Sequence, residues 1–301
     1  MTTGGSRGSI LLLALVAVLF AATLSVALAT RARAAHASAE RMARRRDTMA
    51  ACGSAVALFA AERLASDTNG CDHLGEKWAE PWERRDEGWV MRVSEAGFGS
   101  DGRAAGPIDD SRRIPVAGEF ILAMAALLHE TAGLGEAEAR NVAERMTNGV
   151  PRACVSELAE TEGLGDVAFR RISGLVTIEG ISAININTAP REVVEALLRG
   201  VDPPDHPAAR SLAARIMDFR SAGNFFSSAV PRDVSKDLGG IPADEFRVLS
   251  AVSERIAVSS DVFSGIVEAV DATSWEARRP SARVRFTIDR RDFSLLRWVE
   301  E

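Results

Sequence analysis

The stretch that decides the fold is GSRGSILLLALVAVLFAATLSVALATRAR, residues 5–33, which has no charged side chain between Arg7 and Arg31. Its apolar run extends from Ser9 to Thr30. A helix of about 22 residues, rising about 1.5 Å per residue, crosses the roughly 30 Å hydrocarbon core of a bilayer. A secretory signal peptide has a shorter apolar region of about 7 to 15 residues. The run therefore predicts a transmembrane anchor.

Two observations leave the fate and orientation of this anchor open. Ala27-Leu28-Ala29 offers a small-x-small cleavage site, so removal of the run as a signal peptide is an alternative. Only Arg7 precedes the run, whereas six arginines follow it, and the positive-inside rule then places the C-terminal side in the cytoplasm. These six are Arg31, Arg33, Arg41, Arg44, Arg45 and Arg46.

The helix is predicted to continue beyond the membrane edge. From Ala32 to Ala65 the sequence contains no proline and one glycine, Gly53, and it is rich in residues that favour helix. A loose apolar stripe contains Met42, Met49, Val56 and Leu64. We expect one helix of roughly 55 residues, far longer than a usual globular helix. Because its apolar first half cannot be buried in its own small domain, something else must bury it.

The remaining chain has ordinary globular composition and offers no recognisable catalytic set. About 235 residues follow Ser66, enough for one or two domains with cores. The net charge of −6 argues against a general nucleic-acid-binding surface. Cys52, Cys71 and Cys154 match no metal spacing, and the four histidines are scattered. Pairing of Cys71 with Cys154 in an oxidising compartment is left open. An enzyme is not favoured, because no nucleophile, base and oxyanion set is visible.

Four segments predict one antiparallel sheet, because they lean towards alternation of apolar and polar residues or close the chain. They are residues 87–96, 262–270, 283–289 and 294–300. Two helical blocks lie between the first and the second segment. GLGDVAFRRISGLVTI (163–178) and GIPADEFRVLSAVSERIAV (240–258) share the order of turn, helix and strand, which indicates a weak internal duplication. We expect an α+β fold in which a helical insertion interrupts the sheet.

The turn Gly163-Leu164-Gly165 has the shape of a helix-hairpin-helix, a motif whose exposed amides can hold a phosphate. DNA binding is therefore an alternative. Residues 115–180 contain ten acidic and five basic side chains, however, and non-specific duplex affinity comes from cationic contacts. Asp166, directly after the turn, would repel a phosphate. We favour a compact packing module.

The most specific stretch is VTIEGISAININTAPREVVEALL, residues 176–198. In an extended segment Asn185 and Asn187 alternate with isoleucines, so the amides point to one side and the apolar side chains to the other. We expect the amides to satisfy nearby backbone groups at the entry to a helix, with a binding site as the alternative. Thr188 is expected to cap that helix, and Pro190 to lie in its first turn.

These residues resemble the signature of the minor pseudopilin K subunits of type II secretion systems. The matching motif is Asn185, Asn187, Thr188, Ala189 and Pro190, before a helix that contains Glu-Val. Other segments are similar in the same order along the chain: RGSILLLALVAVL (7–19), ARIMDFRSAGNFFSSA (214–229, with Asn224 replacing a proline), AVSSDVFSGIVEA (257–269) and the end near Trp298. SRRIPVAGEFIL (111–122) departs from the usual Asn-x-Asn segment, which weakens the match of the first repeat.

The resemblance implies how the anchor is processed. In this family a prepilin peptidase cuts after a glycine, which maps onto Gly8 and leaves Ser9 as the mature N-terminus, although Phe or Met is common there. Leu13 is the fifth mature residue, where most pseudopilins carry a glutamate that neutralises a neighbour's N-terminal amine, because an unpaired charge in an apolar medium is costly. A subunit without this carboxylate fits the filament tip, which is the place of the K subunit.

The resemblance and the residues together predict the domains. They are a leader (1–8), an N-terminal helix (9–66, transmembrane over 9–30), a pilin-like α/β domain (67–114 and 256–301) and an inserted all-α domain (115–255) with two helix-hairpin-helix-like repeats (115–180 and 181–255). The expected location is the inner membrane, single-pass, with the globular part in the periplasm.

The resemblance also implies partners and a role. We expect a non-enzymatic tip subunit that assists protein export across the outer membrane, with the minor pseudopilins I and J, the pseudopilus, the inner-membrane secretion platform and prepilin peptidase as partners. Neither nucleic acid nor a cofactor is expected. Family members can bind calcium, but residues 144–153 lack an acidic cluster, Asp109-Asp110 is only a pair, and calcium wants about six or more oxygen ligands. The alternative is a membrane-anchored helix-hairpin-helix DNA receptor.

Overall fold

The computed structural model describes residues 6–67, 70–86, 88–95, 106–148, 152–201, 206–272 and 280–301. The chain divides into two compact units, Met1–Ala51 and Cys52–Glu301. The first unit is helical where it is described, and the second combines an antiparallel sheet with short helices. The predicted α+β class is therefore confirmed. Residues 1–5 of the predicted leader, and residues 87 and 96 of the first predicted strand, lie outside the described residues.

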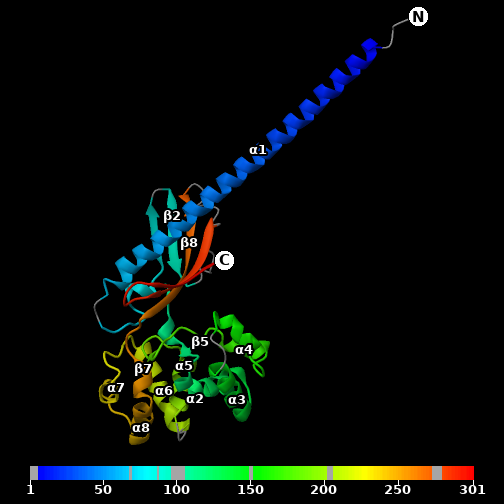
Figure 1. Ribbon diagram of the computed structural model, residues 1–301. Helices are drawn as coiled ribbons and strands as arrows, with labels where there is room; N and C mark the ends of the chain where they lie inside the picture. The colour runs from blue at the N-terminus through cyan, green and yellow to red at the C-terminus, as the bar shows by residue number, and fades with distance from the viewer. Residues whose placement is uncertain are drawn as a thin grey trace, which may run out of the picture. The chain divides into compact units, whose positions relative to one another are not determined.

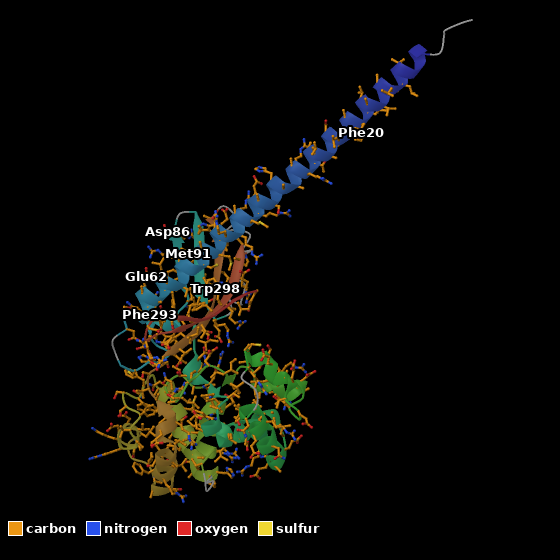
Figure 2. All side chains as sticks on the ribbon, in the orientation of Figure 1. Phe20, Glu62, Asp86, Met91, Phe293 and Trp298 are labelled. Atoms are coloured by element: carbon orange, nitrogen blue, oxygen red, sulfur yellow. The ribbon has the colours of Figure 1, made fainter. Side chains whose placement is uncertain are left out.

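The long N-terminal helix is present. Helix α1 runs from Ser6 to Phe59 and continues as a π-helical segment, Ala60–Leu64 (Figure 1). In the described part of the chain it is the one helix long and apolar enough to cross a membrane. Its large apolar side chains between Leu11 and Leu28 expose 49% to 75% of their surface, and Phe20 is an example (Figure 2).

Six strands form the antiparallel sheet, in the order β1-β2-β8-β9-β10 with β3 also paired to β8. Their bounds are Trp82–Asp86 (β1), Trp89–Ser94 (β2), Ile108–Asp109 (β3), Val262–Asp271 (β8), Ala282–Asp289 (β9) and Leu295–Glu300 (β10). Each of the four predicted segments overlaps one of these strands. Strands β1 and β3 were not predicted. The sequence of β1, WERRD, lacks alternation of apolar and polar residues, and β3 has only two residues.

The last two turns of α1 belong to the second unit and pack on one face of the sheet. Cys52 lies against β8 and Phe59 is fully buried. Val93, Val267 and Val284 are cross-strand neighbours on three successive strands, so they share a face, and all three are fully buried. Full burial of each such side chain contributes about 1.5–3 kcal/mol, so this face is a main source of the unit's stability.

The π-helical end of α1 is also tied to the edge strand β1. The Trp82 indole donates a hydrogen bond to Glu62 Oε2 at 3.0 Å, and Arg84 forms an ion pair with Glu62 Oε1 at 2.5 Å. Glu62 is labelled in Figure 2 at the end of the helix. These contacts fix β1, whose own sequence gives little reason for a strand.

The insertion leaves the sheet after β3 and returns before β8, and its helices gather at one end of the sheet (Figure 1). Its α-helices are α2 (Ile121–Leu127, continued by a π-helical segment, Leu128–Ala132), α3 (Glu136–Thr147), α4 (Asp166–Ile172), α5 (Arg191–Arg199), α6 (His206–Ser221), α7 (Pro231–Asp237) and α8 (Ala243–Ala251). One apolar cluster extends through all of it, from Ile114 to Ile256.

Two short parallel strand pairs occur at corresponding points of the two halves of the insertion. Strand β4 (Ile114–Pro115) pairs with β5 (Val176–Thr177), and β6 (Ile184–Asn185) pairs with β7 (Ile256–Ala257). In each half, the strand that opens the half pairs with the strand that closes it. This symmetry accords with the duplication predicted from the sequence.

The turn at residues 163–165 is a packing element in this structure. Gly163 and Gly165 have φ angles of 89° and 62°, which favour glycine, while Leu164 is buried in the insertion core. The segment before the turn, Val155–Glu160, is a 3-10 helix rather than an α-helix. The buried Leu164 favours the packing interpretation, and the helix-hairpin-helix name stays a prediction for this turn.

Candidate functional site at the junction of sheet and insertion

The Asn-x-Asn-Thr-Ala motif lies where the insertion meets the sheet. Strand β6 contributes Asn185, and the chain then runs through Asn187 to α5. Both asparagines are buried, with 0% and 3% of their surface exposed, as are the neighbouring Ile184 and Ile186. The alternation predicted from the sequence is thus present, but both of its faces are covered. The amides therefore form internal contacts rather than a solvent-facing site.

Asn185 joins three distant parts of the chain. Its Nδ2 lies 3.1 Å from the Asp72 carbonyl oxygen, 3.2 Å from Asp109 Oδ2 and 2.9 Å from Ser260 Oγ, and its Oδ1 accepts a hydrogen bond from the Asn187 N–H at 3.0 Å. These partners come from the loop after α1, from β3 and from the approach to β8. A single buried amide thus connects the insertion to the sheet and to the loop.

Asn187 holds the loop that follows α6. Its Nδ2 donates to the Phe226 carbonyl at 2.9 Å, and its Oδ1 accepts from the Phe226 N–H at 2.8 Å. The prediction that this amide satisfies backbone groups agrees with the structure, but the partner is 39 residues away rather than at the nearby helix entry. Arg220 adds a hydrogen bond to the Ala189 carbonyl at 2.5 Å. The motif thereby fixes both α5 and the end of α6.

Thr188 does not cap α5, so this prediction is wrong. The N-cap residue is Pro190, so Pro190 precedes the first turn, in which it was predicted to lie, and it makes no side-chain cap. Thr188 Oγ1 donates instead to Asp109 Oδ2 at 2.5 Å. The hydroxyl is turned towards Asp109, which is buried within reach, because a hydrogen bond donated to a carboxylate is stronger than one between neutral groups. The competing partner lies 79 residues away, so the local pattern could not reveal it.

The junction contains two buried carboxyl groups. Burial raises the pKa of Asp109 to about 6, against hydrogen bonds from Ser260, Thr188 and the Ser111 backbone that favour its charged form. Burial likewise raises the pKa of Asp72 to about 6, although Arg290 donates to Asp72 Oδ1 at 2.6 Å. For both carboxyl groups, therefore, desolvation raises the pKa by more than the hydrogen-bond and ion-pair partners lower it.

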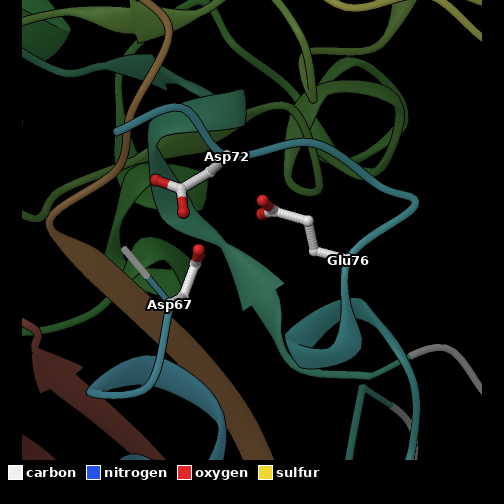
Figure 3. Close-up of side chains that lie close together, drawn as sticks. All are labelled: Asp67, Asp72 and Glu76. Atoms are coloured by element: carbon white, nitrogen blue, oxygen red, sulfur yellow. The ribbon is translucent and has the colours of Figure 1, made fainter. Parts of the chain in front are cut away.

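A group of carboxylates that the sequence analysis did not single out lies beside the junction. Asp67, Asp72 and Glu76 each offer an oxygen, and these oxygens lie within 4.8 Å of one another (Figure 3). Arg290 already forms ion pairs with Asp67 and Asp72, and Trp78 Nε1 donates to Glu76 Oε2 at 2.6 Å. A calcium ion here would compete with Arg290 for Asp67 and Asp72 and with Trp78 for Glu76.

The predicted processing residues all lie in α1. Gly8 and Ser9 belong to its first turn, and Leu13 exposes 73% of its surface. Their proposed roles depend on a peptidase and on neighbouring subunits, so they stay predictions. All three cysteines are free thiols, and the pairing of Cys71 with Cys154 that was left open does not occur in this structure.

Comparisons with known proteins concern the fold. No protein-family model and no curated protein matches this sequence. Among solved structures, the chain is similar to a chain in the crystal structure of the GspK-GspI-GspJ complex from the type 2 secretion system of enterotoxigenic Escherichia coli. The TM-score is 0.58 at 14% sequence identity, and the match covers 90% of this chain and 99% of that chain. The GspK-like, pilin-type fold predicted from the sequence is therefore confirmed.

Proposed function

We propose that this chain is a non-enzymatic minor pseudopilin at the tip of a type II secretion pseudopilus, where it assists protein export across the outer membrane. The observation that carries the proposal is the fold similarity, which extends over 90% of this chain to a chain of a pseudopilin complex. The order of the motifs along the sequence supports it independently. The minor pseudopilins I and J are the proposed partners, because the similar chain was crystallised with proteins of that complex.

Helix α1 has the properties required of a segment that first anchors the subunit in the membrane and is later packed into a filament. Its apolar run can span the inner membrane once, with the globular unit in the periplasm, and the same exposed surface can later pack among the helices of other subunits. Prepilin peptidase would cut after Gly8 and retain the helix. The secretion platform in the inner membrane would then transfer the subunit to the pseudopilus.

The tip position rests on Leu13. A subunit inside the filament needs a carboxylate near its N-terminus to pair with the amine of a neighbour, because an unpaired charge in an apolar environment is costly. Leu13 cannot supply it. A subunit at the end of the filament has no neighbour above it, so leucine is tolerated there.

Complex formation tests the proposal. The full chain is co-expressed with the I-type and J-type minor pseudopilins of the same cell and purified in detergent. We expect a stable complex that contains one copy of each, and the variant Leu13→Glu should retain it, since the globular units are unchanged. The proposed role would be contradicted if the chain purified without the I-type and J-type proteins and if deletion of its gene left protein export intact.

A further inference from the structure

The two units of the chain carry opposite charge. Residues 1–51 contain seven arginines and two acidic side chains, a net charge of +5, whereas residues 52–301 contain 29 basic and 40 acidic side chains, a net charge of −11. Six of the seven arginines lie within sixteen residues, from Arg31 to Arg46, immediately after the apolar run. An apolar helical segment that is followed directly by a basic one indicates a binding partner with an apolar part and an adjacent anionic part.

The arginines of this stretch are exposed. Arg31, Arg33 and Arg41 all face solvent. Two acidic side chains, Glu40 and Asp47, accompany the six arginines. Glu40 is 3.2 Å from His36, and Asp47 is 3.6 Å from Arg46. The two acids offset part of the charge, and residues 31–47 keep a net charge of +4.

The arginines are spread around the helix. With about 100° between successive residues, Arg31 to Arg46 occupy roughly 220° of its circumference. A protein partner that packs along one side would contact only part of this set. A lipid surface surrounds a helix that crosses it. Arg31 and Arg33, about 200° apart around the helix, can both meet headgroups there, whereas a protein packed on one side would contact only one of them.

Distance along the helix axis divides the six arginines into two groups. Arg31 and Arg33 lie about 1.5 and 4.5 Å beyond Thr30, within a headgroup layer of roughly 5–7 Å. Arg44 lies about 21 Å beyond Thr30, farther than the Debye length of about 8 Å in physiological salt. Arg41 lies about 16 Å beyond Thr30, and its Nε donates to the Ala37 carbonyl at 3.2 Å, so it too stays outside the headgroup layer.

We propose that Arg31 and Arg33 bind the headgroups of anionic phospholipids around α1, where the apolar run ends. The more distant arginines contribute only through the longer-range field at low ionic strength. This inference rests on the membrane residence in the proposed function, but not on the partners or the tip position. It holds for either orientation of the helix.

Lipid selectivity tests this directly. The full chain is reconstituted into phosphatidylcholine vesicles that contain a trace of spin-labelled phosphatidylglycerol or spin-labelled phosphatidylcholine, and the motionally restricted fraction of each label is measured by electron paramagnetic resonance. We expect a preference for phosphatidylglycerol of about fivefold for each contacting arginine. The double variant Arg31→Gln/Arg33→Gln should lose it.

Two matched variants remove the same charge elsewhere. Arg44→Gln/Arg45→Gln should keep the preference in physiological salt and lower it only in low salt, and Arg210→Gln/Arg232→Gln, in the globular unit, should keep it throughout. An unchanged preference in the Arg31/Arg33 variant, or none in the wild type, would overturn the proposal. Complex formation with I and J is measured separately, so failure of either proposal can be distinguished.

Discussion

At the scale of single residues, Asn187 shows how the motif acts. One side chain satisfies both backbone groups of Phe226, whose ring is fully buried and stacks on Phe219 at 4.6 Å between centroids. Because these backbone groups are buried, the N–H and C=O of Phe226 cannot form hydrogen bonds with water when the Asn187 amide is removed. The asparagine is thus a substitute for a strand partner, in a loop that has none.

Replacing Asn187 by alanine should therefore destabilise the protein strongly. Two buried backbone groups lose their partners, and we expect a loss of about 2–4 kcal/mol in the free energy of unfolding. Urea unfolding of the full chain in detergent, followed by tryptophan fluorescence, measures it. Asn224→Ala, an exposed asparagine close by, should change stability by less than about 0.5 kcal/mol. Equal losses in the two variants would refute the role of Asn187.

Asp109 makes the stability of the junction depend on pH. Its pKa is raised from 3.8 to about 6 in the folded chain, so between these values the folded state binds more protons than the unfolded state. The contribution of Asp109 to stability is therefore greatest below pH 4 and is lost as the pH rises through about 6.

The variant Asp109→Asn isolates this effect. It stays uncharged, and it can still accept the hydrogen bond from Thr188. We expect its unfolding midpoint in urea to fall less than that of the wild type between pH 4 and pH 7. Parallel pH profiles for the two proteins would show that the Asp109 carboxyl does not titrate in this range.

At the scale of elements, the sequence predicted those whose signal is local. Helix α1 was predicted nearly to its end because no proline interrupts it, and β2, β8 and β9 each carry apolar residues that the sheet buries. Strand β10 was predicted because its segment closes the chain, although its Leu295, Leu296 and Val299 are exposed. Strand β1 was missed because what holds it is the distant Glu62. Thr188 was misassigned for the same reason, since Asp109 lies outside any local window.

The turn at residues 163–165 offers a test at this scale. Gly163 has a φ of 89°, and a β-carbon there would lie 3.0 Å from Val142 Cγ2. We expect Gly163→Ala to cost about 1–2 kcal/mol through backbone strain and this close contact. Gly180→Ala, where a β-carbon would meet nothing within 4 Å and φ is not positive, is the matched control. If the two variants unfold at the same urea concentration, the turn does not require glycine.

At the scale of the whole molecule, the sequence predicted the order of the domains better than it predicted the contacts at the junction of sheet and insertion. The order of motifs indicated an anchor, a sheet and an insertion, and the fold similarity over 90% of the chain agrees with that plan. The junction combines Asp72, Asp109, Asn185, Ser260 and Arg290, which are up to 218 residues apart. No spacing rule brings such residues together, and only the folded chain reveals the network.

The central claim is that α1 is an anchor processed by prepilin peptidase and kept in the mature subunit. The most direct measurement is the N-terminal sequence and mass of the full-length protein from membranes of cells with and without that peptidase. Gly8→Leu should block processing, and Gly5→Leu is the matched control that should not. We predict a mature protein that begins at Ser9 only when the peptidase is present. A protein that begins at Thr30, or that keeps its leader in both cells, would contradict the account.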